Sequence, residues 1–216
     1  MWARLKEWKA EELLQSKGTG YFFCFREKVA CPPIVSWICC RLTARARLTA
    51  SMQKTLQVLN DLVREGVLSR YAIGGAMGAT FYVEPVLTFD LDIFVILPQS
   101  VSGLLTLEPL YAALRARGYD EEGECVIVEG IPVQFLPAYN DLLVEALNDA
   151  REVLYEQTPT QVLRPEHLVA IALQTGRDKD RERVRLLRDE AELDEAYLQH
   201  VLKRHGLADK WNPWKP

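Results

Sequence analysis

Two aspartates separated by one residue, Asp90 and Asp92, lie in an apolar run that reads TFDLDIFVIL from 88 to 97. Side chains alternate between the two faces of a β-strand, so both carboxylates are predicted to project from the same face. Carboxylates held this close repel each other unless a cation lies between them. Mg²⁺, or Mn²⁺ in its place, is the expected ion, because one or two carboxylates together with substrate phosphates commonly hold it.

Gly74 and Gly75 end the apolar run that precedes this strand. Glycine adopts backbone angles that other residues avoid, and it lets a phosphate approach the main chain closely. Residues 76–82 are predicted to form a short helix, and a glycine turn that opens a helix presents free N–H groups to an anion. The pattern therefore favours a metal site beside a phosphate site over a tight turn followed by solvated aspartates.

The glycine pair and the Asp-x-Asp strand together resemble the signature of the polymerase-β-like nucleotidyltransferase superfamily, and most closely its minimal members related to AbiEii-type toxins. The resemblance covers about residues 52–190. It implies a nucleotidyltransferase-like α/β fold, a mixed sheet flanked by helices, with Asp90 and Asp92 as catalytic metal ligands and Gly74 and Gly75 in contact with the nucleotide. It also implies transfer from an NTP to an RNA, a protein hydroxyl or a small molecule, and an antitoxin-type protein partner.

The position of a third acid departs from this signature. Members of the superfamily usually carry another carboxylate on a later strand, and the matching segment, IPVQFL from 131 to 136, places Gln134 there. An amide carries no charge and cannot serve as a base. Glu129 is nearby, but its odd spacing from Gln134 predicts that it faces the other way. Two readings remain: a slow or acceptor-restricted transferase with Gln134 in its catalytic site, and a degenerate nucleotide-binding or partner-binding protein.

A charged segment, TGRDKDRERV from 175 to 184, follows a helix predicted to begin at Pro165. By resemblance to the AbiEii-like group, Arg177 and Lys179 contact phosphates, and Asp180 orients one of them or adds a carboxylate. Arginine and lysine are the expected partners of phosphate. The alternative is a solvated helix with mixed charges.

Bulk composition sets the class of protein. The chain has 216 residues, of which 49% are hydrophobic and 26% charged, as in an ordinary globular protein with one domain and a small appendage. No apolar run reaches the roughly 18 residues that a membrane span needs, and the start lacks a secretory signal. We therefore expect a cytoplasmic protein without membrane contact.

Residues 1–51 differ from the rest, because they hold nine Lys or Arg against four Glu, three of five tryptophans and four of five cysteines. The cysteine spacings match no zinc pattern. We predict an N-terminal extension at 1–51, as a mis-assigned start or a partner-docking arm, an α/β core at 52–150 and a C-terminal helical segment at 151–216. Predicted helices cover 52–66, 75–83, 107–117 and 140–148, and predicted strands 70–74, 88–97, 124–129 and 131–136, with a short extended piece at 152–155.

Overall fold

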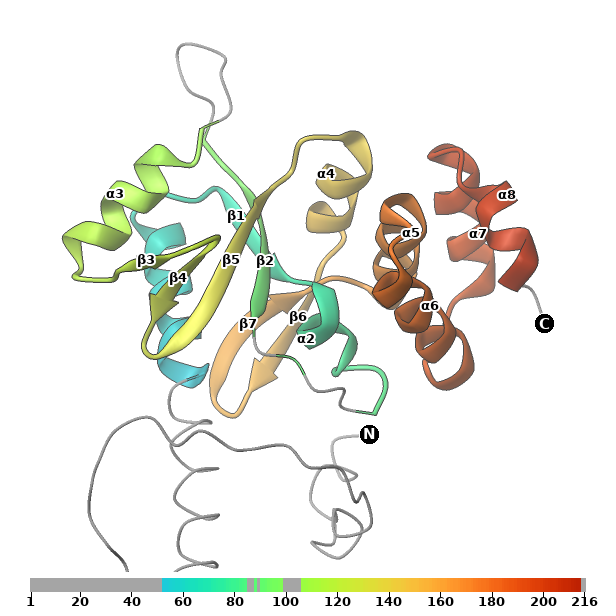
Figure 1. Ribbon diagram of the computed structural model, residues 1–216, viewed down its shortest axis with the longest axis horizontal. Coiled ribbons are helices and arrows are strands. Elements are labelled where there is room, and N and C mark those ends of the chain that lie inside the picture. Colours follow the sequence, from blue (N-terminus) through green and yellow to red (C-terminus); the bar gives the residue numbers. More distant parts are fainter. Residues whose placement is uncertain (1–51, 85–87, 89, 99–105, 215–216) are drawn as a thin grey trace, which may run out of the picture. The chain divides into compact units, whose positions relative to one another are not determined.

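A mixed sheet is the frame of the computed structural model, which describes residues 52–84, 88, 90–98 and 106–214 (Figure 1). Within these residues it has seven strands in the order β3-β4-β5-β2-β1-β7-β6. The strands are β1 (Arg70–Ile73), β2 (Leu91–Ile96), β3 (Glu121–Glu122), β4 (Cys125–Val128), β5 (Ile131–Pro137), β6 (Arg151–Tyr155) and β7 (Thr158–Val162). The central strand β2 is antiparallel to β1 and parallel to β5, and β1 is parallel to β7. The predicted mixed sheet is confirmed.

Helices flank this sheet and follow it in the chain, as the sequence predicts. The described helices are one at 52–64, α2 (Gly75–Ala79), α3 (Glu108–Ala116), α4 (Asp141–Asn148), α5 (Pro165–Thr175), α6 (Asp178–Glu190), α7 (Glu195–Arg204), α8 (Ala208–Trp211) and the 3-10 turn η3 (Asn212–Trp214). The ends follow known capping rules. Asn140 accepts a hydrogen bond from the Leu143 N–H at 2.9 Å, Pro165 occupies the first turn of α5, and Gly176 ends α5 in the left-handed conformation.

Apolar residues of the central strands divide between the two faces of the sheet. Leu91 and Ile93 belong to a core that includes the helix at 52–64 and α3. Phe94 belongs to a second core that includes α4, α5, α6 and α7. Because residues alternate along a strand, Asp92 shares its face with Phe94 and not with Leu91. The sheet therefore presents Asp92 toward the side that carries the C-terminal helices.

Strand β7 departs from the prediction, which has a single extended piece in this region. Its sequence, TPTQV, contains Pro159 and alternates polar residues, so it lacks the apolar signal of a core strand. Thr158 and Thr160 are nevertheless buried, and the Thr160 hydroxyl lies 3.1 Å from the hydroxyl of Tyr71. This hydroxyl contact accompanies the apolar packing of Val162, which is fully buried. The helices of the C-terminal segment begin only at Pro165, after two strands of the main sheet.

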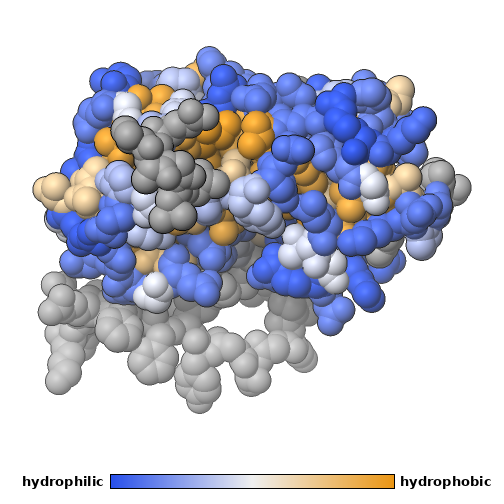
Figure 2. All heavy atoms as spheres, turned by 90° about the horizontal axis from the view of Figure 1, so that it is seen from above, coloured by the Kyte–Doolittle hydropathy of each residue, from blue (hydrophilic) through white to orange (hydrophobic). Residues whose placement is uncertain are grey.

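Other boundaries shift by a few residues. Helix α2 ends at Ala79 and continues as turns, which makes it shorter than the predicted helix at 75–83. The face shown in Figure 2 is mainly hydrophilic, with apolar side chains in smaller patches. Among the described helices, none combines the length and the apolar character needed to cross a membrane. The predicted extension at 1–51 lies outside the described residues.

Candidate functional site

Asp90 and Asp92 line one pocket of about 430 Å³ at the start of β2. The Thr88 hydroxyl donates a hydrogen bond to Asp90 Oδ1 at 3.0 Å. The Gly74 N–H donates to the backbone oxygen of Asp92 at 2.9 Å, which ties the glycine turn to the strand. The structure thus brings the two predicted carboxylates together beside the predicted glycine pair.

The glycine turn lies directly against the Asp92 carboxylate. Gly75 has a φ of 57°, and a Cβ built on it would overlap Asp92 Oδ2. A Cβ on Gly74 would overlap the ring of Phe94. Both glycines are therefore required by the packing of β2 against the start of α2, a reason for them that the sequence pattern did not reveal.

Helix α6 supplies cations to the same pocket. Lys179 and Arg183 line it together with the two aspartates. Asp180, which is 1% exposed, accepts hydrogen bonds from Arg177 Nε at 2.7 Å and from Arg183 Nη1 at 3.1 Å. It also accepts from the Arg177 N–H at 3.3 Å, which caps the helix. Asp180 thus orients two guanidinium groups, and Arg183 joins the residues that the sequence singled out.

The charges in this pocket act on Asp92. Burial raises the pKa of Asp92, and the neighbouring carboxylate of Asp90 raises it further, whereas Arg183, Lys179 and Arg177 act in the opposite direction. Two acidic side chains lie close together and face cations. A further positive charge would stabilise the ionised form of both carboxylates. Carboxylate oxygens are also the ligands that Mg²⁺ prefers.

Gln134 lies beside Asp92 in the parallel pair of β2 and β5, so the two side chains share one face of the sheet. Its amide nitrogen donates a hydrogen bond to Glu124 Oε2 at 3.1 Å. Burial raises the pKa of the Cys125 thiol, and the charges of Asp90, Asp92 and Glu124 raise it further. The thiol and three carboxylates therefore share one electrostatic neighbourhood.

Sequence reasoning missed Glu124 and Cys125. The missing signal was the register of the hairpin formed by β4 and β5, in which Val126 pairs with Val133. Continuing this register by one position places Cys125 opposite Gln134. A hairpin whose turn is Glu129-Gly130 therefore predicts that Cys125, and Glu124 before it, lie near Gln134. Glu129 itself lies elsewhere, since Tyr119 donates a hydrogen bond to Glu129 Oε1 at 2.9 Å.

A larger pocket of about 650 Å³ lies at the helix 52–64 and β7. Arg64, Arg70 and several amide side chains line it, but none of the described lining residues is an acid. It therefore lacks the paired carboxylates that distinguish the smaller pocket.

Asp180→Ala tests the orienting role of this buried carboxylate. We expect a loss of about 2 kcal/mol in the free energy of unfolding, because the substitution leaves two guanidinium groups without their shared partner. This is less than the roughly 3–5 kcal/mol usual for a broken buried pair, since the Arg177 side chain is 57% exposed. Urea unfolding measures it, and Asp178→Ala, at an exposed position in the same turn, is the control. Equal losses for both variants would contradict the role.

Comparisons with known proteins give limited likenesses of fold. No family model matches the chain, and no curated protein matches it. An antigenic nucleotidyltransferase-like protein from Paracoccidioides brasiliensis is 14% identical, with a TM-score of 0.47, over 76% of this chain and 93% of that one. The antibiotic-resistance factor ANT(2'')-Ia is 15% identical, with a TM-score of 0.44, over 79% and 99%. The Megavirus polyadenylate synthase is 13% identical, with a TM-score of 0.35, over 76% and 40%.

Proposed function

We propose that this chain is a divalent-metal-dependent nucleotidyltransferase. One observation carries the proposal: Asp90 and Asp92 share a pocket with Lys179 and Arg183, whose side chains come from a helix far along the chain. Paired carboxylates suit a metal ion, and the facing cations suit phosphates. The AbiEii-like affiliation, the RNA or protein acceptor and an antitoxin-type partner belong to this proposal and rest on the sequence motif alone.

Asp90 and Asp92 fit Mg²⁺ or Mn²⁺ by their carboxylate oxygens and by their closeness, since the charge of Asp90 raises the pKa of Asp92. They are the residues that would hold the ion. When bound, such an ion neutralises phosphate charge and aligns the attacking and leaving oxygens.

The remaining residues have roles that follow from their positions. Arg183 and Lys179 face the aspartates across the pocket and bind the triphosphate, and Arg177 adds a charge near Asp92. Gly74 and Gly75 hold Asp92 in place and let the nucleotide approach the main chain. In the reaction, an acceptor oxygen forms a bond to the α-phosphorus, the bond to the bridging oxygen breaks, and pyrophosphate leaves with the electron pair.

The proton of the acceptor hydroxyl requires a base, and Gln134 cannot provide one. We propose Glu124 instead, because its carboxylate accepts a hydrogen bond from Gln134, the residue that pairs with Asp92. We assign Glu124 the role of third carboxylate, with Gln134 as its positioning residue. In this proposal, an acid that directly precedes β4 takes the place of the acid missing from β5.

The direct test is transfer by the purified chain. With Mg²⁺ and each α-labelled NTP, the chain is mixed with total tRNA, with cell protein or with small hydroxyl compounds, and pyrophosphate release and label transfer are measured. Release that requires both Mg²⁺ and an acceptor supports the proposal. Release that survives in Asp90→Asn and Asp92→Asn variants would place the activity elsewhere.

A second function is a catalytically degenerate nucleotide binder, and Gln134 at the third-acid position favours it. Such a protein binds Mg·NTP with the same residues but releases no pyrophosphate with any acceptor class. Equilibrium binding of labelled NTP, measured with Mg²⁺ and with EDTA, separates the two functions. Equal affinity in both conditions contradicts each of them.

Gln134→Glu tests the arrangement of the third acid. We expect tighter Mn²⁺ binding, because the substitution places a carboxylate on the face of Asp92, beside Glu124. Glu124→Gln is expected to leave metal affinity nearly unchanged and to lower turnover by roughly 10²–10⁴, the usual contribution of a general base. Titration with Mn²⁺ by paramagnetic resonance gives the affinities. Unchanged turnover in Glu124→Gln would remove Glu124 from the reaction.

A further inference from the structure

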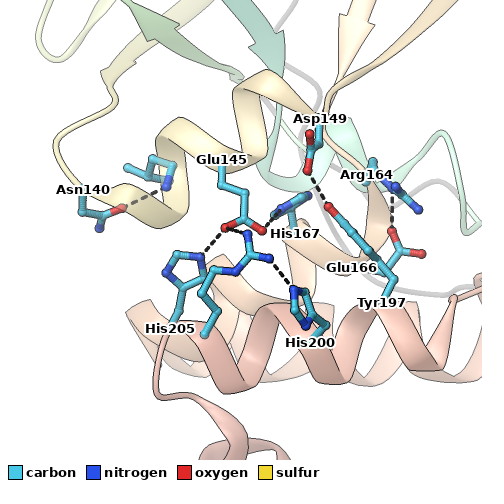
Figure 3. A network of polar contacts seen from close by, with 11 residues as sticks. Asn140, Glu145, Asp149, Arg164, Glu166, His167, Tyr197, His200 and His205 are labelled. Carbon is cyan, nitrogen blue, oxygen red and sulfur yellow. Dashed lines mark hydrogen bonds and ion pairs between the residues drawn. The ribbon is translucent and has the colours of Figure 1, made fainter.

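A second cluster of ligand-type side chains lies where α4, α5 and α7 meet (Figure 3). Glu145 comes from α4, Asp149 from its C-terminal cap, and His167 from the first turn of α5. Each offers one ligand atom, and the three atoms all lie within 4.8 Å of one another. None of the residues that line the pocket of Asp90 and Asp92 belongs to this cluster.

His167 has no hydrogen-bond partner among the described residues, although its side chain is fully buried. Its Nε2 faces Glu145 Oε1 at 3.6 Å, which is too long for a hydrogen bond. Glu145 Oε1 is also buried and lacks a partner in the described structure. Buried polar groups are nearly always satisfied, and a contact of 3.6 Å, which is an ion pair only if His167 is protonated, leaves both atoms able to bind a further partner.

The spacing of these atoms suits a metal ion. Two ligands about 2.1 Å from one ion at a tetrahedral angle lie about 3.4 Å apart, close to the 3.6 Å between His167 Nε2 and Glu145 Oε1. Asp149 is exposed at the end of its helix, so its carboxylate can adjust and also provides an entry path. We propose that Glu145, Asp149 and His167 bind a zinc-class divalent cation, with water as a fourth ligand.

Side chains around the three proposed ligands hold two of them in place through hydrogen bonds and ion pairs. Arg204 Nη1 and His205 Nε2 each lie 2.8 Å from Glu145 Oε2, which leaves Oε1 for the ion. The Tyr197 hydroxyl donates to Asp149 Oδ2 at 2.6 Å. Ligating carboxylates are typically hydrogen-bonded in this way.

The charge balance also allows a cation. Two carboxylates carry two negative charges, Arg204 returns one, and a divalent ion leaves the cluster at about +1.

A bound ion would connect the sheet domain to the C-terminal helices, because α4 packs beside the sheet and α5 follows its last strand. Its expected effect is on the stability of the fold, and the proposal does not rest on the proposed transferase activity. The probe is Zn²⁺ itself, added to the metal-free full chain, with Mg²⁺ as a comparison. We expect one Zn²⁺ per chain by elemental analysis and a melting temperature about 5–10 °C higher at 100-fold excess over the dissociation constant.

Variants locate the ion. Asp149→Asn keeps an acceptor for Tyr197 and removes a charged ligand, so Zn²⁺ affinity is expected to fall at least about tenfold. His167→Gln removes the nitrogen ligand. His200→Gln is the control, because His200 is exposed, contacts Arg204 and lies outside the group of three proposed ligands. Co²⁺ in place of Zn²⁺ gives a visible absorption band that reports the ligand geometry without relying on stability.

Two results would overturn the proposal. One is a full chain whose melting temperature responds neither to Zn²⁺ nor to EDTA and which retains no ion. The other is Zn²⁺ bound with equal affinity by the Asp149→Asn, His167→Gln and His200→Gln variants. Repeating the titration in an Asp92→Asn background excludes a contribution from the other carboxylate pair.

Discussion

Asp92→Asn is expected to lower nucleotidyl transfer by roughly 10²–10⁴, because a metal ion contributes several kcal/mol of charge stabilisation and Asp92 is one of its two proposed ligands. The folded chain should not be weakened. Burial and Asp90 both raise the pKa of Asp92, so an uncharged amide removes a repulsion that the ligand-free protein carries. Single-turnover kinetics and thermal melting without ligand measure the two effects.

The control is Asp209→Asn, which removes the same charge at an exposed position in α8. It should change neither quantity. If Asp92→Asn lowers the melting temperature by more than Asp209→Asn and leaves Mg·NTP affinity intact, Asp92 is a structural residue and the metal assignment fails.

Gly75→Ala should abolish the site by steric overlap. The new Cβ would occupy the space of Asp92 Oδ2, and the φ of 57° is also unfavourable for alanine. We expect a loss of about 3 kcal/mol or more in the free energy of unfolding, or a displaced Asp92 carboxylate with Mg·NTP affinity at least about 100-fold weaker.

Gly66→Ala separates the two causes. Gly66 has a φ of 75°, but a Cβ there would meet nothing within 4 Å, so this variant carries only the conformational cost of about 1–2 kcal/mol. The difference between the two variants is the contribution of the Asp92 contact. A Gly75→Ala variant that matches Gly66→Ala in stability and binds Mg·NTP normally would show that the contact is unimportant.

Local patterns predicted much of the fold. Alternation identified β2 and β5, Gly130 marked the turn before β5, and Pro165 marked the start of α5, because each signal acts within a few residues. Strand β7 gave no such signal, since it is rich in polar residues and its buried Thr160 contacts the hydroxyl of Tyr71, a residue distant in sequence. Local sequence carries little information about contacts between residues that are distant in the chain.

The same distinction applies to the site. Asp90 and Asp92 lie two residues apart, and the glycine pair follows the preceding strand, so their meeting was predictable from strand geometry. The placement of Arg183 depends on Asp180 and on the docking of α6, about ninety residues later. The link between Gln134 and Glu124 depends on hairpin register. The catalytic and nucleotide-binding roles of all these residues remain predictions.

Helix α5 begins beside His167 and ends at Gly176, immediately before Arg177. Eleven helical residues span about 16 Å, and a helix of this length tilts as a rigid rod. A cation held at its first turn therefore constrains the direction in which its last turn points, and with it the guanidinium group that Asp180 holds. Any energetic coupling along this helix is reciprocal, so a cation that tightens nucleotide binding is itself bound more tightly, by the same factor, when the nucleotide is present.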